Sequence, residues 1–205
     1  MNEKRYDMGA GDLSLDFANT SNWHASSNPE EMMVNYDDLV TWGEQAGLLT
    51  KGQAGRIRRL AIDAPDQANQ AYRSAIDLRE AIYDVFSNRY AGQPIPAEDL
   101  EYLNAAVRAA MAHLVLVPTD GGFVWEWAPE ADGINLILWP VARAAASLLT
   151  SDLAGRVREC EDDRGCGYLF IDQSKNHSRR WCSMDSCGNR AKARRHYARA
   201  QGAVS

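Results

Sequence analysis

The 205-residue sequence has no uncharged apolar run approaching the ~18 residues that a membrane-spanning helix requires. The best such run, residues 134–142, stops at Arg143. The opening residues 1–7 are too polar for a secretory signal peptide. We therefore expect a cytoplasmic protein, in which thiols stay reduced and disulfides are not expected.

Common catalytic motifs are also missing. The sequence has no Gly-rich phosphate-binding loop, no nucleophile elbow and no His-Glu-x-x-His pattern, so we do not expect an enzyme. Scattered tryptophans leave open a pocket for a small-molecule effector in the N-terminal region, although such aromatics more often belong to a core. They are Trp23, Trp42, Trp125, Trp127 and Trp139.

Acidic residues are scarce at the C-terminal end. Residues 172–205 contain eight Lys or Arg against only Asp172 and Asp185, a net charge of +6. The preceding residues hold 14 basic and 26 acidic side chains, a net charge of −12, so the whole chain carries −6. This contrast predicts an acidic body that carries a basic end for an anionic partner.

Apolar periodicity predicts a mainly α fold of the α+β class. The clearest helix follows Pro65 and ends before Gly92, because its apolar residues recur every three or four positions. These residues are Ala71, Ala75, Leu78, Ile82, Val85 and Phe86. We also expect helices near residues 37–47, 51–61, 97–111 and 134–157, the last either kinked by Pro140 or starting near it. In the helix over 97–111, the residues expected to face inward are Leu100, Leu103, Val107 and Met111.

Two segments favour extended structure. Leu13, Leu15 and Phe17 alternate with polar residues, which predicts a short strand or an extended entry segment. Apolar runs at 114–117 and 123–127 flank a Gly-containing turn, which predicts a β-hairpin. We expect a helical N-terminal domain over 1–152 and a small C-terminal domain over 153–205.

All four cysteines lie near the basic end. Cys160, Cys166, Cys182 and Cys187 form two pairs on either side of a short linker, and two such pairs can supply the four sulfurs of one structural zinc ion. Four reduced core cysteines and an iron–sulfur cluster are the alternatives. His177 and His196 are alternative ligands, although each fits a turn or a phosphate-facing position better.

The linker between the pairs predicts a second hairpin. Residues 168–171 indicate one strand, 173–177 a turn and 178–181 the returning strand, with Trp181 expected in the hairpin core rather than as a platform for stacked bases. After Cys187, residues 190–200 contain no Gly or Pro and favour a helix. The arrangement predicts a treble-clef-like zinc finger, and the metal should supply ~10 kcal/mol to a segment too small for its own core.

The run Cys-Ser-Met-Asp-Ser-Cys-Gly-Asn-Arg at 182–190 resembles the defining motif of the CGNR zinc-finger family. Residues 167–181 resemble the rest of that finger. Residues 11–20, Gly-x-Leu-x-Leu-Asp-Phe-x-Asn-Thr, are similar to the start of the ABATE domain that usually precedes it. The resemblance implies a stress-response transcription regulator whose finger binds zinc through its four cysteines and binds nucleic acid.

The basic C-terminal helix predicts contacts to phosphates and to guanine edges, most simply of DNA. The predicted contact residues are Lys175, Arg179, Arg180, Arg190, Lys192, Arg194, Arg195 and Arg199. Two alternatives remain: a solvated helix face, and a zinc-stabilised adaptor that binds an acidic protein. Because one finger provides few base contacts, a homodimer is also expected.

Overall fold

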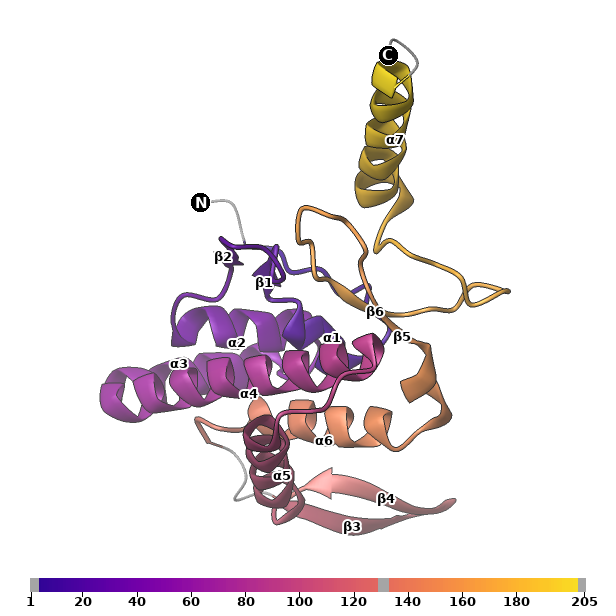
Figure 1. Cartoon of the computed structure of the whole chain (residues 1–205). Helices are drawn as coiled ribbons and strands as arrows, with labels where there is room; N and C mark the ends of the chain where they lie inside the picture. The colour runs from indigo at the N-terminus through magenta and orange to yellow at the C-terminus, as the bar shows by residue number, and fades with distance from the viewer. Residues whose placement is uncertain (1–3, 129–132, 203–205) are drawn as a thin grey trace.

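The computed structural model describes residues 4–128 and 133–202, with the backbone alone for residues 196 and 198–202. A helical body lies between the cysteine-containing region and a β-hairpin at the opposite end (Figure 1). The helices of the body are α1 (Leu13–Ala18), α2 (Tyr36–Gln45), α3 (Lys51–Asp63), α4 (Pro65–Ala91), α5 (Ala97–Met111) and α6 (Leu138–Leu149). The predicted mainly α fold class is confirmed.

Local sequence signals fix the helix ends. The Asn35 side chain accepts the backbone N–H of Asp38 and begins α2, while Thr50 and Gln53 form a reciprocal capping box at the start of α3. Pro65 begins α4, and Gly92 ends it in the left-handed conformation with φ of 66°. These caps place three of the predicted helices, α2, α3 and α4, within a few residues of their expected positions.

Helix α4 is the centre of the body and contacts α1, α2, α5 and α6. The six apolar residues that predicted it are all buried. The indole of Trp42 packs edge-on against the ring of Phe17, with centroids 4.8 Å apart. Among the helices that the structure describes, none is long and apolar enough to cross a membrane.

The extended segment predicted at Leu13, Leu15 and Phe17 is wrong, because these residues belong to α1. The Asp12 side chain accepts the backbone N–H of Ser14 and starts the helix. Leu15 and Phe17 both become fully buried in the helical form. Capping and burial therefore outweigh an alternation that extends over only a few residues.

The helix predicted over 134–157 is shorter than expected. Pro140 lies in the first turn of α6, where its missing N–H breaks no helical hydrogen bond, so the position near a helix start is correct. A short 3₁₀ helix (Asp152–Arg156) follows, and then strand β5 (Val157–Glu159). Leu100 and Met111 were expected to face inward in α5, but they are 41% and 48% exposed.

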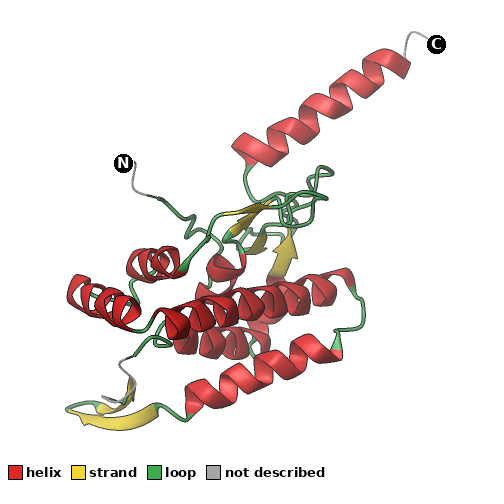
Figure 2. Cartoon of the chain, turned by 90° about the vertical axis from the view of Figure 1, so that its left-hand side faces the viewer, coloured by secondary structure: helices red, strands yellow, loops and turns green. Residues whose placement is uncertain are grey.

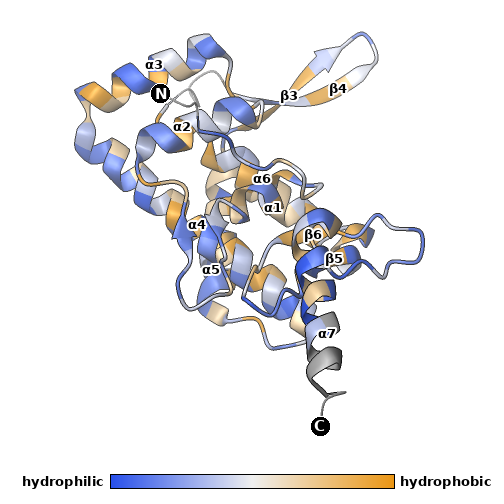
Figure 3. Ribbon diagram, turned by 90° about the horizontal axis from the view of Figure 1, so that it is seen from above, coloured by the Kyte–Doolittle hydropathy of each residue, from blue (hydrophilic) through white to orange (hydrophobic). Residues whose placement is uncertain are grey.

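The hairpin of β3 (Leu114–Thr119) and β4 (Gly122–Trp127) confirms the prediction, with Thr119 opposite Gly122 at the turn. It extends from the body and carries apolar residues along both strands (Figure 3). Phe123 is 72% exposed and Trp125 49% exposed, so the expectation that the tryptophans belong to the core fails at Trp125. Two small strands, β1 (Ser21–Asn22) and β2 (Glu30–Glu31), close a separate loop next to α4.

The C-terminal region shares the core of the body. Strand β6 (Leu169–Ile171) pairs antiparallel with β5, and Val157, Leu169 and Ile171 join the main apolar cluster. The predicted returning strand over 178–181 is wrong, because the partner of β6 is β5. The chain ends in α7 (Asn189–Gly202), which stands out from the rest of the molecule (Figures 1 and 2).

Candidate metal centre and basic helix

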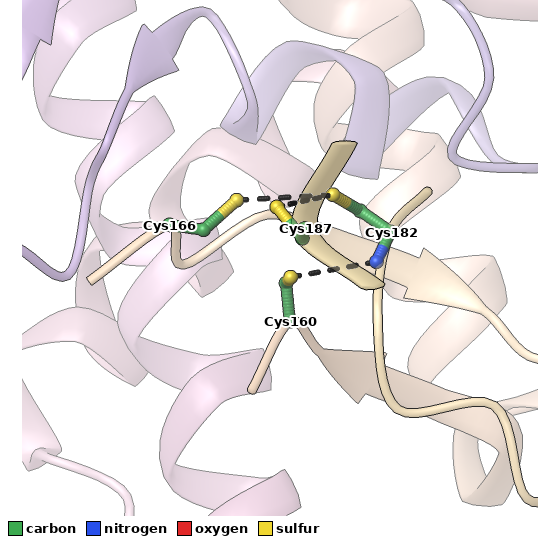
Figure 4. A group of neighbouring side chains, drawn as sticks. All are labelled: Cys160, Cys166, Cys182 and Cys187. Atoms are coloured by element: carbon green, nitrogen blue, oxygen red, sulfur yellow. Dashed lines mark hydrogen bonds between the residues drawn. The ribbon is translucent and has the colours of Figure 1, made fainter. Parts of the chain in front are cut away.

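The structure brings the four cysteine sulfurs together (Figure 4). All four sulfurs lie within 4.8 Å of one another, with 3.8 Å between Cys166 and Cys182 and 3.5 Å between Cys182 and Cys187. A tetrahedral zinc ion with bonds of about 2.3 Å separates its sulfur ligands by about 3.8 Å. The cluster therefore has the dimensions to hold one zinc ion.

The positions of the cysteines follow from the local fold. Cys160 follows β5, and its backbone N–H donates to the carbonyl oxygen of Tyr168, which continues the β5–β6 ladder by one residue. Cys187 belongs to a wide helical turn (Met184–Gly188) that leads directly into α7. The metal ligands thus connect the strands that belong to the core with the helix that projects from it.

The four sulfurs can be thiolates together only if a cation lies among them. Hydrogen bonding with the Cys160 sulfur, and then with Cys166, raises the pKa of the Cys182 thiol, because neighbouring sulfurs cannot all ionise without a positive charge between them. Four thiolates would complete a tetrahedral shell and leave no position for a substrate, as in structural zinc sites. His177 is not part of the cluster, since its Nδ1 lies 3.3 Å from the carbonyl oxygen of Asp172. The side chain of His196 lies outside the described part of the chain.

A buried carboxylate between the first two cysteines organises the start of α7. The side chain of Asp162 is 0% exposed and lies 3.0 Å from Arg190 and 3.2 Å from Arg194, the first two arginines of the helix. Burial alone would raise the pKa of Asp162, but the backbone N–H of Arg164 and the guanidinium of Arg190 lower it to about 2. Asp162 therefore stays ionised and binds both arginines.

Arg190 also stabilises the candidate metal site directly. Its Nη2 lies 2.8 Å from the sulfur of Cys187, and the backbone N–H of Cys182 lies 3.4 Å from the sulfur of Cys160. Such donors favour the thiolate form that binds a metal and fix the orientation of the ligands. Arg190 thus connects a candidate zinc ligand to Asp162.

The predicted nucleic-acid contacts divide into residues whose guanidinium groups have partners within the finger and residues that have no acidic partner among those the structure describes. Besides Arg190 and Arg194, Arg180 is paired, 2.6 Å from Glu161. Arg179 donates to the carbonyl oxygens of Trp181 and Cys182, and its guanidinium lies 4.4 Å from the centroid of Phe170. These arginines stabilise the finger itself.

Three other predicted contacts are exposed and have no acidic partner among the described residues: Lys175, Lys192 and Arg195. Arg195 donates to the carbonyl oxygen of Ala191, and its guanidinium lies 5.7 Å from the ring centroid of Trp181. Trp181 is half-buried beside the cysteines, although the hairpin expected to enclose it does not form. The side chain of Arg199 lies outside the described part of the chain.

Sequence reasoning missed three residues that shape this region. Asp162 could have been found as a lone acid inside a cysteine pair that precedes a basic helix. Asn19 pairs with the backbone of Leu169, 150 residues away, and no local signal indicates this contact. The same holds for Trp23, whose ring lies beside the guanidinium groups of Arg164 and Arg190.

Comparison with known families agrees with this geometry. The ABATE family, described as "Putative stress-induced transcription regulator", matches residues 11–152. The CGNR zinc finger matches residues 156–200, which include all four cysteines. A search of curated proteins finds no match. The chain therefore belongs to the ABATE family and ends in a CGNR zinc finger whose four clustered cysteines can hold one zinc ion.

Proposed function

We propose that the protein is a DNA-binding transcription regulator in which one structural zinc ion supports α7 as the nucleic-acid contact. The observation that carries the proposal is the projection of a basic helix from the cysteine cluster, away from an acidic body (Figure 2). A helix can enter the major groove of DNA only when it is not covered by its own protein. The acidic body would repel nucleic acid and confine binding to this end.

The ion pairs within the protein indicate which basic residues of α7 are available to bind DNA. Lys192 and Arg195 are exposed and, among the described residues, have no acidic partner, so their charges are available to phosphates. Arg190 and Arg194 are bound to Asp162, which assigns them to holding the helix. Lys175 extends the basic surface from the loop before the second cysteine pair. The proposed contact surface is therefore Lys175, Lys192 and Arg195.

Binding to duplex DNA across a salt series tests this proposal. The log of the binding constant should fall with the log of the salt concentration by about 0.9 for each phosphate neutralised. The double variant Lys192→Ala/Arg195→Ala should flatten the slope by about 2 and keep one zinc per chain. Lys51→Ala, an exposed lysine on α3, is the matched control and should change nothing.

The outcomes separate two classes of function. Zinc-loaded protein that binds no DNA or RNA at low salt would refute the proposal and favour an adaptor for an acidic protein. An unchanged slope in the double variant would refute the assigned contact surface. The proposal assigns no catalytic step to the chain.

The proposed regulator also binds a small-molecule effector, in its N-terminal domain. A cavity of about 320 Å³ lies between α4, α5 and α6 and is lined by Leu78, Tyr102, Leu138 and Trp139 among others. Its size and apolar lining suit a small uncharged molecule. Compounds that raise the melting temperature of wild-type protein but not of Ala106→Trp, which fills the cavity, would identify such a ligand.

We also propose that the regulator acts as a homodimer, because one short helix offers few base contacts. Sedimentation equilibrium of the zinc-loaded chain tests this directly. The mass of one chain for the free protein, together with one chain per duplex in the DNA complex, would refute it.

A further inference from the structure

The loop between β1 and β2 places Trp23 against two arginines of the zinc finger. The guanidinium carbon of Arg164 lies 4.8 Å from the centroid of a ring of Trp23, and that of Arg190 lies 5.2 Å from it. Arg164 belongs to the loop between the first two cysteines, and Arg190 to the first turn of α7. One indole of the ABATE domain therefore contacts both parts of the finger that carry α7.

The backbone of this loop is held in an unfavourable conformation. Trp23 has φ of 55°, in the left-handed region that a bulky residue rarely adopts. Such a conformation persists only where the surrounding contacts impose it. The backbone N–H of Ser26 donates to the carbonyl oxygen of Trp23 at 2.9 Å and closes the turn.

The cysteine loop packs directly on this turn. A Cβ at Gly165 would lie 2.6 Å from the Cα of Ser26, and a Cβ at Gly167 would lie 2.6 Å from the backbone nitrogen of Ala25. Both glycines have positive φ, 81° and 68°. Only glycine permits this approach, so the turn and the segment 160–167 form one closely packed unit.

The next residue of the turn connects it to the body. The Nε2 of His24 lies 2.8 Å from Glu80 of α4, and its ring packs against the tilted ring of Tyr83 on the same helix with centroids 3.5 Å apart. Glu80 in turn accepts from the buried Arg79, which binds Glu31 of β2 through two hydrogen bonds of 2.7 Å. Adjacent side chains of one turn thus bind α4 on one side and the finger on the other.

We propose that Trp23 is a positioning residue that fixes α7 relative to the helical body through Arg164 and Arg190. The ion pairs of Arg190 and Arg194 join α7 to Asp162, which is itself part of the finger, so they do not provide this connection. The cysteines join α7 to the strands of the core, and the packing of two guanidinium groups on one indole adds a direct contact with the β1–β2 loop that needs the aromatic face, not only the apolar volume. The effect on DNA binding rests on the function proposed above, whereas the effect on α7 does not.

Three variants of the zinc-loaded full chain separate the contribution of the aromatic face of Trp23 from that of its apolar volume. Trp23→Phe keeps an aromatic face, Trp23→Leu keeps apolar volume without one, and Trp125→Ala removes an exposed tryptophan of the hairpin as a control. The measurements are zinc content, amide hydrogen exchange in α7 and the affinity for duplex DNA. We expect one zinc per chain in every variant.

In Trp23→Leu, exchange of the first-turn amides of α7 should accelerate and DNA affinity should fall about tenfold. Trp23→Phe should stay within about threefold of wild type, and Trp125→Ala should match it. Unchanged α7 exchange in Trp23→Leu, equal losses in the Phe and Leu variants, or loss of zinc in both would each overturn the proposal. If the wild type binds no DNA, the proposed function fails, while the exchange data still decide the role of Trp23.

Discussion

Replacing Asn19 with Ala should destabilise the protein strongly, although Asn19 is neither a metal ligand nor an apolar core residue. Its side-chain amide donates to the carbonyl oxygen of Leu169 at 2.8 Å and accepts the N–H of the same residue at 2.9 Å. Asn19 is 8% exposed and Leu169 is fully buried, so water cannot replace the lost partner. Each orphaned backbone group costs about 1–3 kcal/mol, which gives a loss of about 3 kcal/mol in the free energy of unfolding.

Urea unfolding of the zinc-loaded chain, followed by circular dichroism and tryptophan fluorescence, measures this loss. Asn22→Ala is the matched control, because Asn22 is exposed and its hydrogen bond to Glu30 is long at 3.4 Å. The control should change the free energy of unfolding by less than about 0.5 kcal/mol. A loss below about 1 kcal/mol in Asn19→Ala would refute the reasoning that this amide replaces a missing strand partner of β6.

Three further predictions follow from single sites. Gly167→Ala should lower the free energy of unfolding in urea by at least about 2 kcal/mol more than Gly47→Ala does. Both glycines have left-handed φ, but only at Gly167 would the added Cβ collide with neighbouring atoms. Equal losses in the two variants would contradict the close approach. Burial raises the pKa of Asp16 to about 6, so the folded state binds its proton more tightly than the unfolded state. The stability that Asp16 contributes to the folded state through this proton is fully present below about pH 4 and is lost as the pH rises through 6. Asp16→Asn should therefore be more stable than wild type at pH 8, by about 1–2 kcal/mol after allowance for solvent screening, and the difference should vanish towards pH 4; a less stable variant at pH 8 would contradict it. Cys182→Ser should lower the zinc content below one per chain and release α7 to hydrogen exchange, while α4 stays protected. Retained zinc would contradict the role of Cys182 as a ligand, and loss of protection in α4 would contradict the confinement of the change to the region around the cysteines.

The fold was predictable where apolar periodicity is long or where a turn is explicit. Helix α4 repeats its apolar positions over several turns, and the glycines between β3 and β4 identify their hairpin. Helix α1 has only six residues, too few for a helical period to stand out against the alternation of Leu13, Leu15 and Phe17. The partner of β6 was not predictable, because strand pairing depends on contacts distant in the sequence and β5 lies at the end of an apolar run that resembled a helix.

The candidate site was also predictable only in part: the cysteine ligands were, and the roles of the arginines were not. Cysteine spacing and the family motif indicated the four-sulfur cluster, since metal ligands must be of a particular chemical type and occur close together. The roles of the arginines were not predictable from charge. Asp162 lies 28 residues before Arg190 and 32 before Arg194, and only the folded chain shows that it binds both.

The pairing of Asn19 with Leu169 has a consequence for biosynthesis. The amide of Asn19 leaves the ribosome about 150 residues before its backbone partner. During that interval the side-chain amide of Asn19, at the end of α1, has no backbone partner for the hydrogen bonds that it makes in the buried core. We therefore expect the core around α1 to be complete only after β6 has been translated, so a chain truncated before residue 169 should be recognised by chaperones and proteases as unfinished.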